Sequence, residues 1–417
     1  MELPGAIHFI GIGGAGMAPM ADLLLKRGVQ VSGSDLALNE KCRSLMENGA
    51  VIRSGHAAEN VPENTGLIVF SSAVSSDNPE RIKGRLLGIP EMRRGEFLAL
   101  FLGLYRRVAA VSGSHGKSSI TAMLVHILRE CGFSPGYMIG ANVPGGKSSD
   151  AGKDDDIFVT EADESDATHK LLSPYLGIVP NVDGDHAWSV GGDEALKENF
   201  RIFARRSEKV LCFDTETELF SGMKNLHILP EISGKDSFAG HFGFMAQNAC
   251  LAVESAVYLG CEREQALRAA ASYSGIRRRM TLHYSGNDYT VIEDYAHHPN
   301  EVKNSIEYLR LKYPEHHLRI VFQPHRYARL EKFFDAFVQV LKTPDSLFVV
   351  PVFAAWTESG KVDSVMLAKE CGGVYISGSW QENAQEVLVP PEDGKELLIA
   401  VLGAGDIEEI IPYLSKQ

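Results

Sequence analysis

Short apolar runs alternate with helical segments along the whole chain, and this alternation restricts the fold more than any other feature. Each run is apolar on both faces of an extended strand, which is typical of parallel sheets covered by helices. The sequence therefore predicts the α/β fold class. The predicted strands are AIHFIG (6–11), LIVFSS (67–72), RVAAVS (107–112), DIFVTE (156–161), YLGIVPN (175–181), KVLCFD (209–214), YTVIED (289–294), LRIVFQ (318–323), SLFVVPV (346–352) and ELLIAVLG (396–403).

The length of 417 residues exceeds what one compact core usually holds, so two or three domains are expected. A fresh strand starts directly after Arg106, and the stretch SGIRRRM (274–280) marks a second joint. The sequence thus predicts three α/β domains, at residues 1–106, 107–278 and 279–417.

The composition restricts partners and location. A formal net charge of −13 disfavours nucleic acid, which needs a basic surface. Six cysteines without a Cys-x-x-Cys pair are typical of a reducing compartment. The N-terminus lacks a secretion signal, and no apolar run approaches the roughly 18 residues of a membrane helix. We expect a cytoplasmic monomer or weak homodimer with small-molecule substrates and neither nucleic acid nor membrane as partner.

A glycine-rich segment, GIGGAG, follows the first predicted strand and opens a helix. It matches G-x-G-x-x-G through Gly11, Gly13 and Gly16, and Asp35 follows at the distance of a ribose-binding acid. Bare glycines let the backbone approach a diphosphate at a helix N-terminus. The motif alone leaves open a dinucleotide or another nucleoside diphosphate.

A second glycine-rich segment, GSHGKSS (113–119), joins another strand to an amphipathic helix. It departs from G-x-x-x-x-G-K-[ST], because Val111 stands where the first glycine is expected. Its context is still that of a phosphate loop, in which Lys117 reaches the outer phosphates and Ser118 binds Mg²⁺. The alternative is a glycine-rich turn beside a surface lysine.

Acidic residues follow the next two strands, at the edge where α/β sheets bind ligands. VTEADESD supplies Glu161, and VPNVDGDH supplies Asn181, Asp185 and His186. Hard oxygen ligands suit Mg²⁺. Beside a phosphate loop, a metal or phosphate role for His186 is favoured over that of a buried core histidine.

The last third of the chain offers two further candidates. The adjacent His297 and His298 do not indicate zinc, because no H-E-x-x-H pattern accompanies them. Arg326 and Arg329 lie three residues apart after a strand. They are either solvated arginines or planar forks for a carboxylate or phosphate.

Nine segments stand in order along nearly the whole chain: HFIGIGGAGM (8–17), VSGSD (31–35), SSAVSSDNPE (71–80), GSHGKSS (113–119), EADESD (161–166), NVDGDH (181–186), DYAHHPNEV (294–302), QPHRYAR (323–329) and LGAGD (402–406). Together they resemble the motifs of the Mur ligases. In that family the phosphate loop is the shorter G-[TS]-x-G-K-[TS], so Val111 is expected to end a strand and the loop to begin at Gly113.

The resemblance implies a Rossmann-like N-terminal domain that binds a UDP-sugar, a P-loop ATPase-type central domain that binds ATP, and a Rossmann-like C-terminal domain that contributes amino-acid and nucleotide contacts. The implied UDP-sugar contacts are Gly13, Gly14, Ala15, Gly16, Asp35, His56 and Ser71. The implied ATP contacts are Gly113, Ser114, His115, Gly116, Lys117, Ser118, Ser119, Asn248, Arg278 and Arg279. The implied metal ligands are Ser118, Glu161 and His186. The implied catalytic residues are Lys117, Glu161, His186, His297, Arg326 and Arg329, and the implied amino-acid contacts are Tyr295, His297 and Arg329.

The resemblance also implies an activity: an ATP-dependent, amide-bond-forming ligase that joins L-alanine to UDP-N-acetylmuramate through an acyl phosphate, in peptidoglycan precursor synthesis, with ATP and Mg²⁺ as cofactors. A related ligase that uses a recycled peptide or another amino acid stays open, as does a catalytically degenerate nucleotide-binding paralogue. The retained Lys117 and Glu161 disfavour the paralogue, whereas Phe244 and Met245, which replace the family's His-Asn before the adenine-contacting helix, favour it. An NAD-dependent dehydrogenase would leave the second loop unexplained.

Overall fold

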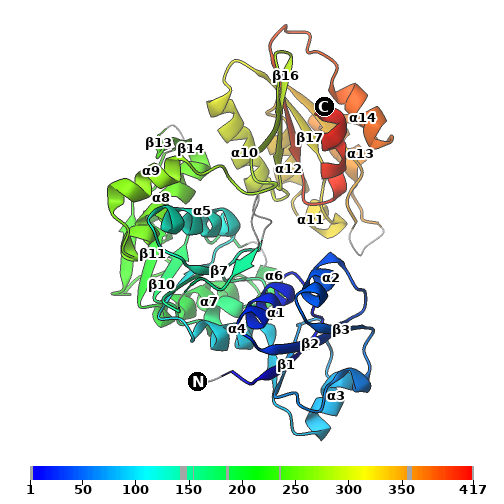
Figure 1. The fold of residues 1–417 in the computed structure, drawn as a ribbon. Helices are drawn as coiled ribbons and strands as arrows, with labels where there is room; N and C mark the ends of the chain where they lie inside the picture. Colours follow the sequence, from blue (N-terminus) through cyan, green and yellow to red (C-terminus); the bar gives the residue numbers. More distant parts are fainter. Residues whose placement is uncertain are drawn as a thin grey trace. The chain divides into compact units, whose positions relative to one another are not determined.

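The computed structural model describes residues 3–140, 148–153, 155–184, 187–233, 236–354 and 359–415. It confirms the α/β class, with three sheets of mainly parallel strands flanked by helices (Figure 1). The chain divides into two compact units, one of Met1–Glu231 with Asn248–Tyr273 and one of Ile232–Gln247 with Ser274–Gln417. The boundaries at 1–106, 107–278 and 279–417 stay a prediction. Within the described ranges, no helix has both the length and the apolar character to cross a membrane.

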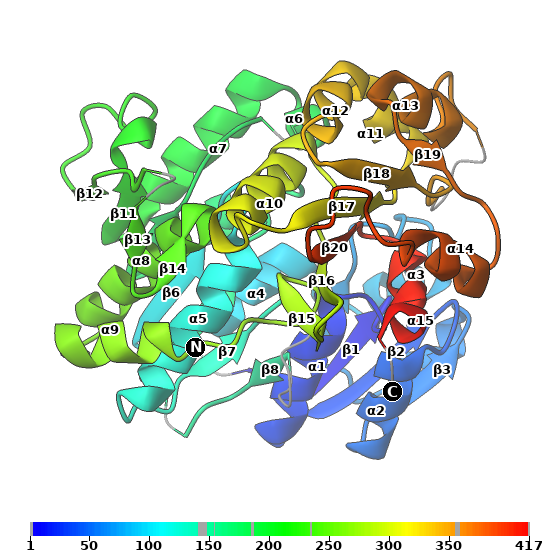
Figure 2. The same cartoon turned by 90° about the horizontal axis from the view of Figure 1, so that it is seen from above.

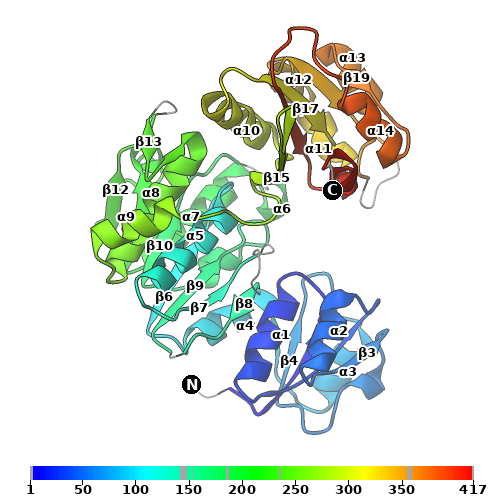
Figure 3. The same ribbon diagram turned by 45° about the horizontal axis from the view of Figure 1, so that its top comes forward.

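The first unit begins with a five-stranded parallel sheet in the order β3-β2-β1-β4-β5 (Figures 1 and 3, blue). The chain moves outward from β1 through β2 to β3 and then returns to the other side of β1, so the strand order reverses there. Ligands bind at such reversals in doubly wound sheets. The strands are β1 (Ala6–Ile10), β2 (Gln30–Asp35), β3 (Val51–Ser54), β4 (Leu67–Phe70) and β5 (Glu91–Arg93). The helices are α1 (Met17–Lys26), α2 (Glu40–Glu47), η1 (Ala58–Asn60), α3 (Pro79–Leu86) and α4 (Arg94–Leu102).

A seven-stranded sheet in the order β12-β11-β10-β6-β9-β7-β8 forms the rest of this unit (Figure 1, cyan to green). Only β8 runs antiparallel to its neighbour. Its strands are β6 (Arg107–Val111), β7 (Gly136–Met138), β8 (Ser149–Asp150), β9 (Ile157–Glu161), β10 (Leu176–Val179), β11 (Lys209–Phe213) and β12 (Leu226–Leu229). The helices are α5 (Lys117–Glu130), η2 (Thr168–Leu171), α6 (Ala187–Val190), α7 (Asp193–Arg206), η3 (Asp214–Glu216), α9 (Arg263–Ala271) and α8 (Gly243–Tyr258), of which the part from Asn248 onward belongs to this unit.

The second unit holds a six-stranded sheet in the order β15-β16-β20-β17-β18-β19 (Figure 2, yellow to red). Only β15 is antiparallel, and the central strand β20 is fully buried. Helix α12 contacts both α10 and α13, while α14 contacts α15 and η4, as expected for the two faces of one sheet. The strands of this sheet are β15 (Thr281–Ser285), β16 (Tyr289–Asp294), β17 (His317–Phe322), β18 (Ser346–Val349), β19 (Val374–Tyr375) and β20 (Leu397–Leu402). A separate antiparallel pair consists of β13 (Ser237–Phe238) and β14 (His241–Phe242). The helices are α10 (Pro299–Lys312), α11 (Tyr327–Lys332), α12 (Phe334–Leu341), α13 (Ser364–Cys371), α14 (Trp380–Val387), η4 (Asp406–Ile410) and α15 (Ile411–Leu414).

Strand β16 ends in two buried carboxylates with different surroundings. Glu293 lies 2.8 Å from His283 Nε2 and 2.9 Å from Arg278 Nε. Asp294 accepts a hydrogen bond from Ser305 Oγ at 2.8 Å through Oδ2, while its Oδ1 has no hydrogen-bond partner among the described residues. Burial raises the pKa of Asp294 to about 6. The charge on Asp294 is therefore a cost to the folded unit at neutral pH.

Replacement of Asp294 by asparagine is expected to stabilise the second unit above pH 6. Because the pKa of Asp294 is higher in the folded than in the unfolded chain, the folded state binds more protons between about pH 4 and 6, and its unfolding free energy falls as pH rises. Asparagine removes the buried charge, so this fall of up to about 3 kcal/mol should disappear. Urea denaturation across pH 4–8 would measure it.

Asp345→Asn provides a control of opposite sign. Hydrogen bonds to Asp345 from Arg310 and from the Leu318 N–H lower its pKa, outweighing burial, the largest influence, which raises it. Its charged form stabilises the fold, and that contribution is lost as pH falls through the lowered pKa. The two variants should therefore change the pH profile in opposite directions. An Asp294→Asn profile identical to that of the wild type would refute the assignment.

Candidate active site

The second glycine-rich loop lies between β6 and α5. Val111 is the last residue of β6 and pairs with Glu161 and Ile178 on the two neighbouring strands. Gly116 adopts φ +86°, and a Cβ there would lie 2.7 Å from Asn248 Oδ1. A Cβ at Gly113 would lie 2.8 Å from the ring of Pro180. Both glycines are thus required by close packing, and the loop begins at Gly113, as the shorter motif predicts.

Asn181 fixes the shape of this loop. Its Oδ1 accepts the His115 N–H at 2.8 Å, its Nδ2 donates to the His115 carbonyl at 3.2 Å, and its own carbonyl accepts the Ser114 N–H at 3.1 Å. Ser114 Oγ in turn accepts the Asp183 N–H at 3.0 Å. The sequence suggested Asn181 as a candidate ligand, whereas its contacts assign it to holding the backbone of the loop.

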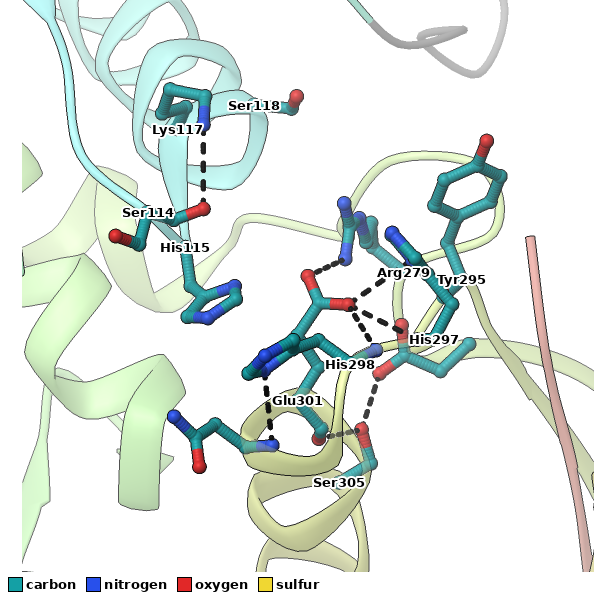
Figure 4. A network of polar contacts seen from close by, with 12 residues as sticks. Ser114, His115, Lys117, Ser118, Arg279, Tyr295, His297, His298, Glu301 and Ser305 are labelled. Atoms are coloured by element: carbon teal, nitrogen blue, oxygen red, sulfur yellow. Dashed lines mark hydrogen bonds and ion pairs between the residues drawn. The ribbon is translucent and has the colours of Figure 1, made fainter. Parts of the chain in front are cut away.

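Lys117 forms an ion pair with Glu164, a residue that sequence analysis did not single out. Its Nζ lies 3.0 Å from Glu164 Oε1 and donates to the carbonyl of Gly113 at 2.6 Å. It also donates to the carbonyl of Ser114 at 3.3 Å (Figure 4). Burial raises the pKa of Glu164 to about 7, even beside this cation. Burial also acts to lower the pKa of Lys117, but attraction to Glu164 outweighs it and raises that pKa. The loop therefore holds a protonated lysine at neutral pH.

Ser118 and Glu161 place two hard oxygens side by side. Ser118 Oγ lies 3.0 Å from Glu161 Oε2, and Glu161 Oε1 accepts the Gly140 N–H at 2.6 Å. Two adjacent ligands of an octahedral Mg²⁺ with bonds of about 2.1 Å lie about 3 Å apart, so this pair fits the ion by spacing and chemistry. His186, the third predicted ligand, and Asp185 lie outside the described residues.

The first glycine-rich turn is held by the predicted ribose acid. Asp35 Oδ2 accepts the Gly13 N–H at 2.8 Å, and Gly14 donates its N–H to the Gly11 carbonyl at 3.2 Å. The following helix, α1, has neither an acidic residue in its first turn nor a side-chain cap. Its positive N-terminus is therefore not neutralised from within the helix, as an anion site requires.

Arg94 also borders this turn, although the sequence gave no reason to select it. A Cβ at Gly16 would lie 2.6 Å from Arg94 Nη1. The guanidinium is held by an ion pair with Asp166 and lies 3.4 Å from Thr168 Oγ1. The other predicted UDP-sugar residues lie at the same carboxyl edge of the sheet, with Ala15 inside the turn, His56 after β3 and Ser71 after β4. These positions are consistent with the predicted contacts, which stay predictions.

In the second unit, the predicted residues around Tyr295 and His297 gather at the start of α10 (Figure 4). Glu301 Oε2 accepts the His297 N–H at 3.0 Å, and Arg279 Nη1 lies 3.5 Å from Glu301 Oε1. The guanidinium groups of Arg278 and Arg279 lie 4.9 and 5.2 Å from the ring centre of Tyr295. Arg278 Nη2 also donates to the carbonyls of Gly403 and Gly405 at 2.9 and 3.0 Å. This arginine therefore ties the glycine-rich turn after β20 to Tyr295.

His297 is a neutral imidazole with a defined proton. Burial lowers its pKa to about 4; Glu301 acts to raise this pKa, and Arg329 and Arg279 lower it further. Its Nδ1 lies 2.9 Å from the Tyr295 carbonyl. A carbonyl only accepts, so Nδ1 carries the proton and Nε2 is a hydrogen-bond acceptor. This state suits contact with an amine.

The two predicted arginines after β17 have different settings. Arg326 adopts φ +68°, a backbone conformation that is strained for a residue with a side chain and is found mainly at functional sites. Arg329 Nη1 lies 3.2 Å from His325 Nδ1. Burial lowers the pKa of His325 to about 3, so this ring accepts the hydrogen bond as a neutral base. The pairing orients Arg329 without neutralising it.

The phosphate loop with its lysine, at the carboxyl edge of a parallel sheet, defines the class: a P-loop α/β enzyme. Residues 6–106 match the family model described as "Mur ligase family, catalytic domain". Residues 278–405 match the family model described as "Mur ligase, glutamate ligase domain". The chain is 35% identical to the UDP-N-acetylmuramate–L-alanine ligase of Janthinobacterium sp. (strain Marseille), over 87% of this chain and 91% of that protein. It is 33% identical to the enzyme of the same name from Aquifex aeolicus, over 98% and 97%. The chain belongs to the Mur ligase family, whose members are ATP-dependent ligases.

Solved structures agree with the fold. The UDP-N-acetylmuramate–alanine ligase of Thermotoga maritima superposes with a TM-score of 0.78 at 24% identity, covering 98% of both chains. The MurF ligase of Thermotoga maritima, solved in complex with ADP, superposes with a TM-score of 0.60 at 15% identity, covering 99% of this chain and 98% of that one. At these identities the likeness concerns the fold alone.

Glu164→Gln is expected to abolish a fall in the unfolding free energy of the first unit between about pH 5 and 7. The raised pKa of Glu164 makes its charged form a cost to the folded state even beside Lys117, so the wild type loses stability as pH rises through this range and the neutral amide does not. Urea denaturation across about pH 4–8 would measure the difference. The matched control is Glu198→Gln, which removes a carboxylate paired with Arg205 on the exposed face of α7. The control should leave the pH profile in this range nearly unchanged. A Glu164→Gln profile identical to that of the wild type would contradict the assignment.

Proposed function

We propose that this protein is an ATP-dependent ligase that joins L-alanine to UDP-N-acetylmuramate through an acyl-phosphate intermediate, in the synthesis of peptidoglycan precursors. The observation that carries the proposal is the Gly113–Ser119 loop, with a protonated Lys117 and the Ser118–Glu161 oxygen pair. Support also comes from relatives of that name at 35% and 33% identity. The cytoplasmic location, the lack of nucleic-acid or membrane partners, and a monomer or weak homodimer stay predictions.

The chemistry requires a cation where phosphate charge develops. The carboxylate of the sugar nucleotide attacks the γ-phosphorus of ATP, the bond to the β-phosphate oxygen breaks, and ADP leaves. The amine then attacks the acyl carbon, phosphate departs, and the amine loses a proton. Lys117 stabilises the charge that spreads over the phosphoryl oxygens. Ser118 and Glu161 would hold Mg²⁺, which neutralises charge on the β- and γ-phosphates, and we propose His186 as a further ligand.

The residues of the second unit are suited to an amino acid. Arg329 carries a guanidinium that can pair with the α-carboxylate in a planar fork. Nε2 of the neutral His297 can accept a hydrogen bond from the amine. With a pKa of about 4, His297 is a weak base, so we assign it to orienting the amine rather than to holding the proton. Tyr295 positions Arg278 and Arg279 by cation–π contact, consistent with the nucleotide contacts predicted for both.

The proposal is tested by phosphate release from ATP with UDP-N-acetylmuramate and a panel of acceptors. Release that requires both the sugar nucleotide and L-alanine, with the expected amide detected by mass spectrometry, supports it. Release only with another amino acid or with a peptide would establish the related ligase instead. Absence of release with every acceptor would contradict the assignment as a ligase.

Lys117→Ala is expected to lower turnover by at least about a thousandfold, because the transferring phosphoryl loses a cation that its transition state requires. Binding of UDP-N-acetylmuramate should stay within about twofold, since that ligand is assigned to the Gly13–Gly16 turn. Calorimetry and steady-state kinetics measure the two quantities. Lys197→Ala, on the exposed face of α7, is the control and should change neither. A parallel loss of both quantities in Lys117→Ala would contradict this division of roles.

A further inference from the structure

A buried polar cluster lies beneath the carboxyl edge of the N-terminal sheet, and no role has been assigned to it. Glu80, in the first turn of α3, and His8, in β1, are both fully buried. Glu80 Oε2 accepts hydrogen bonds from His8 Nε2 and from Ser34 Oγ, each at 2.8 Å. Glu80 Oε1 accepts the Ala57 N–H at 3.2 Å and Asn60 Nδ2 at 3.0 Å. A buried carboxylate that accepts four hydrogen bonds is a specific structural element, unlike a solvated acid on the surface.

Glu80 is ionised in this setting. Burial acts to raise its pKa, but the hydrogen bonds from His8, Asn60 and Ser34 outweigh burial and lower it. The position of Glu80 in the first turn of α3 adds stabilisation from the helix N-terminus. As an ionised carboxylate, Glu80 only accepts hydrogen bonds. Every group that contacts it must therefore point a hydrogen toward it.

This requirement fixes a proton on His56, a residue predicted to contact the UDP moiety. Ser34 has one hydroxyl hydrogen, and Glu80 takes it. The remaining contact of Ser34 Oγ is His56 Nδ1 at 2.9 Å, so the oxygen must accept there and Nδ1 must donate. The same nitrogen lies 3.4 Å from Glu80 Oε1. His56 therefore carries its proton on Nδ1, and its Nε2 is a hydrogen-bond acceptor when the ring is neutral.

The sheet order indicates what Nε2 meets. The glycine-rich diphosphate turn follows β1, Asp35 ends β2, and His56 follows β3, so the three lie in succession along one edge. In nucleotide-binding sheets of this type, the ribose extends from the β1 turn toward the end of β2. His56 is the next group outward. A ribose hydroxyl is a donor that an Nε2 acceptor complements.

We propose that Glu80 is a positioning residue for the sugar nucleotide: acting through Ser34, it keeps the His56 proton on Nδ1 so that Nε2 accepts a hydrogen bond from a ribose hydroxyl. The inference rests on the proposed function, because it takes the ligand of this edge to be a uridine nucleotide. In this inference, Glu80 influences ligand binding through Ser34 and His56, without contacting the ligand itself.

Glu80→Gln gives the sharpest prediction. The amide offers donors as well as an acceptor, so its NH₂ can donate to Ser34 Oγ, and the Ser34 hydroxyl can then turn toward His56 Nδ1. When the Ser34 hydroxyl donates to His56 Nδ1, that nitrogen becomes an acceptor and the His56 proton moves to Nε2. Nε2 then faces the ribose hydroxyl as a donor, where the wild-type ring offers an acceptor. Ser34→Ala is a second variant, which removes the hydroxyl that links Glu80 to His56.

The tautomer can be read directly from the full-length protein. With ¹⁵N-labelled histidine at alkaline pH, long-range ¹H–¹⁵N spectra distinguish Nδ1–H from Nε2–H, and the His56 signals are assigned by their loss in His56→Gln. We expect Nδ1–H in the wild type and Nε2–H in Glu80→Gln. A wild-type His56 protonated on Nε2 would overturn the inference, whether or not the variants fold.

Binding provides the second readout. Calorimetry with UDP and with 2′,3′-dideoxy-UDP should show that Glu80→Gln and Ser34→Ala weaken UDP by about tenfold, the scale of one well-made hydrogen bond, while barely affecting the dideoxy analogue. Ser32→Ala, which removes only the 2.8 Å contact to His8 Nδ1, is the control and should leave both affinities unchanged. Equal weakening of both nucleotides would indicate general damage and overturn the inference. A wild-type protein that binds no UDP would contradict the proposed function itself.

Discussion

The central constraint on this enzyme is the close packing of the turn between β6 and α5, from which the proposed phosphate binding follows. Glycine is required at Gly113 and Gly116 because any side chain would meet Pro180 or Asn248. Asn181 then holds the turn by three hydrogen bonds to its backbone. Without these hydrogen bonds, the positions of Lys117 and Ser118 at the start of α5 would not be defined. The proposed phosphate chemistry depends on those positions.

Buried and half-buried carboxylates organise the polar groups around the candidate sites. Glu164 holds Lys117, Glu301 accepts the backbone N–H groups of His297 and His298, and Glu80 holds Ser34. Each carboxylate contributes only acceptors, so it dictates which way its partners' hydrogens point. Fixed donors and acceptors of this kind are what electrostatic catalysis and selective binding require. For Glu80, the cost of burying the charge is offset by several hydrogen bonds rather than by solvent.

Much of the fold could be predicted from the local pattern of apolar residues and glycines in the sequence. The predicted strand at 6–11 became β1, and that at 396–403 became the fully buried β20, because continuous apolar runs have no stable place except a covered parallel sheet. The glycine-rich segments were recognisable because their backbone geometry excludes other residues. Lys117, Ser118 and Glu161 were selected by their positions after strands, and the structure brings the last two within 3.0 Å of each other.

The sequence by itself determined the α/β class, the family and the two glycine-rich turns, since each is encoded in neighbouring residues. It did not single out Glu80, Glu164 or Arg94, which look like ordinary charged residues of helices and loops. Their roles depend on burial and on hydrogen bonds to residues far away in the chain: 46 positions separate Ser34 from Glu80, and 47 separate Lys117 from Glu164. Only the tertiary structure decides such pairings, because the energy of a buried charge is set by what packs against it and not by its neighbours in sequence.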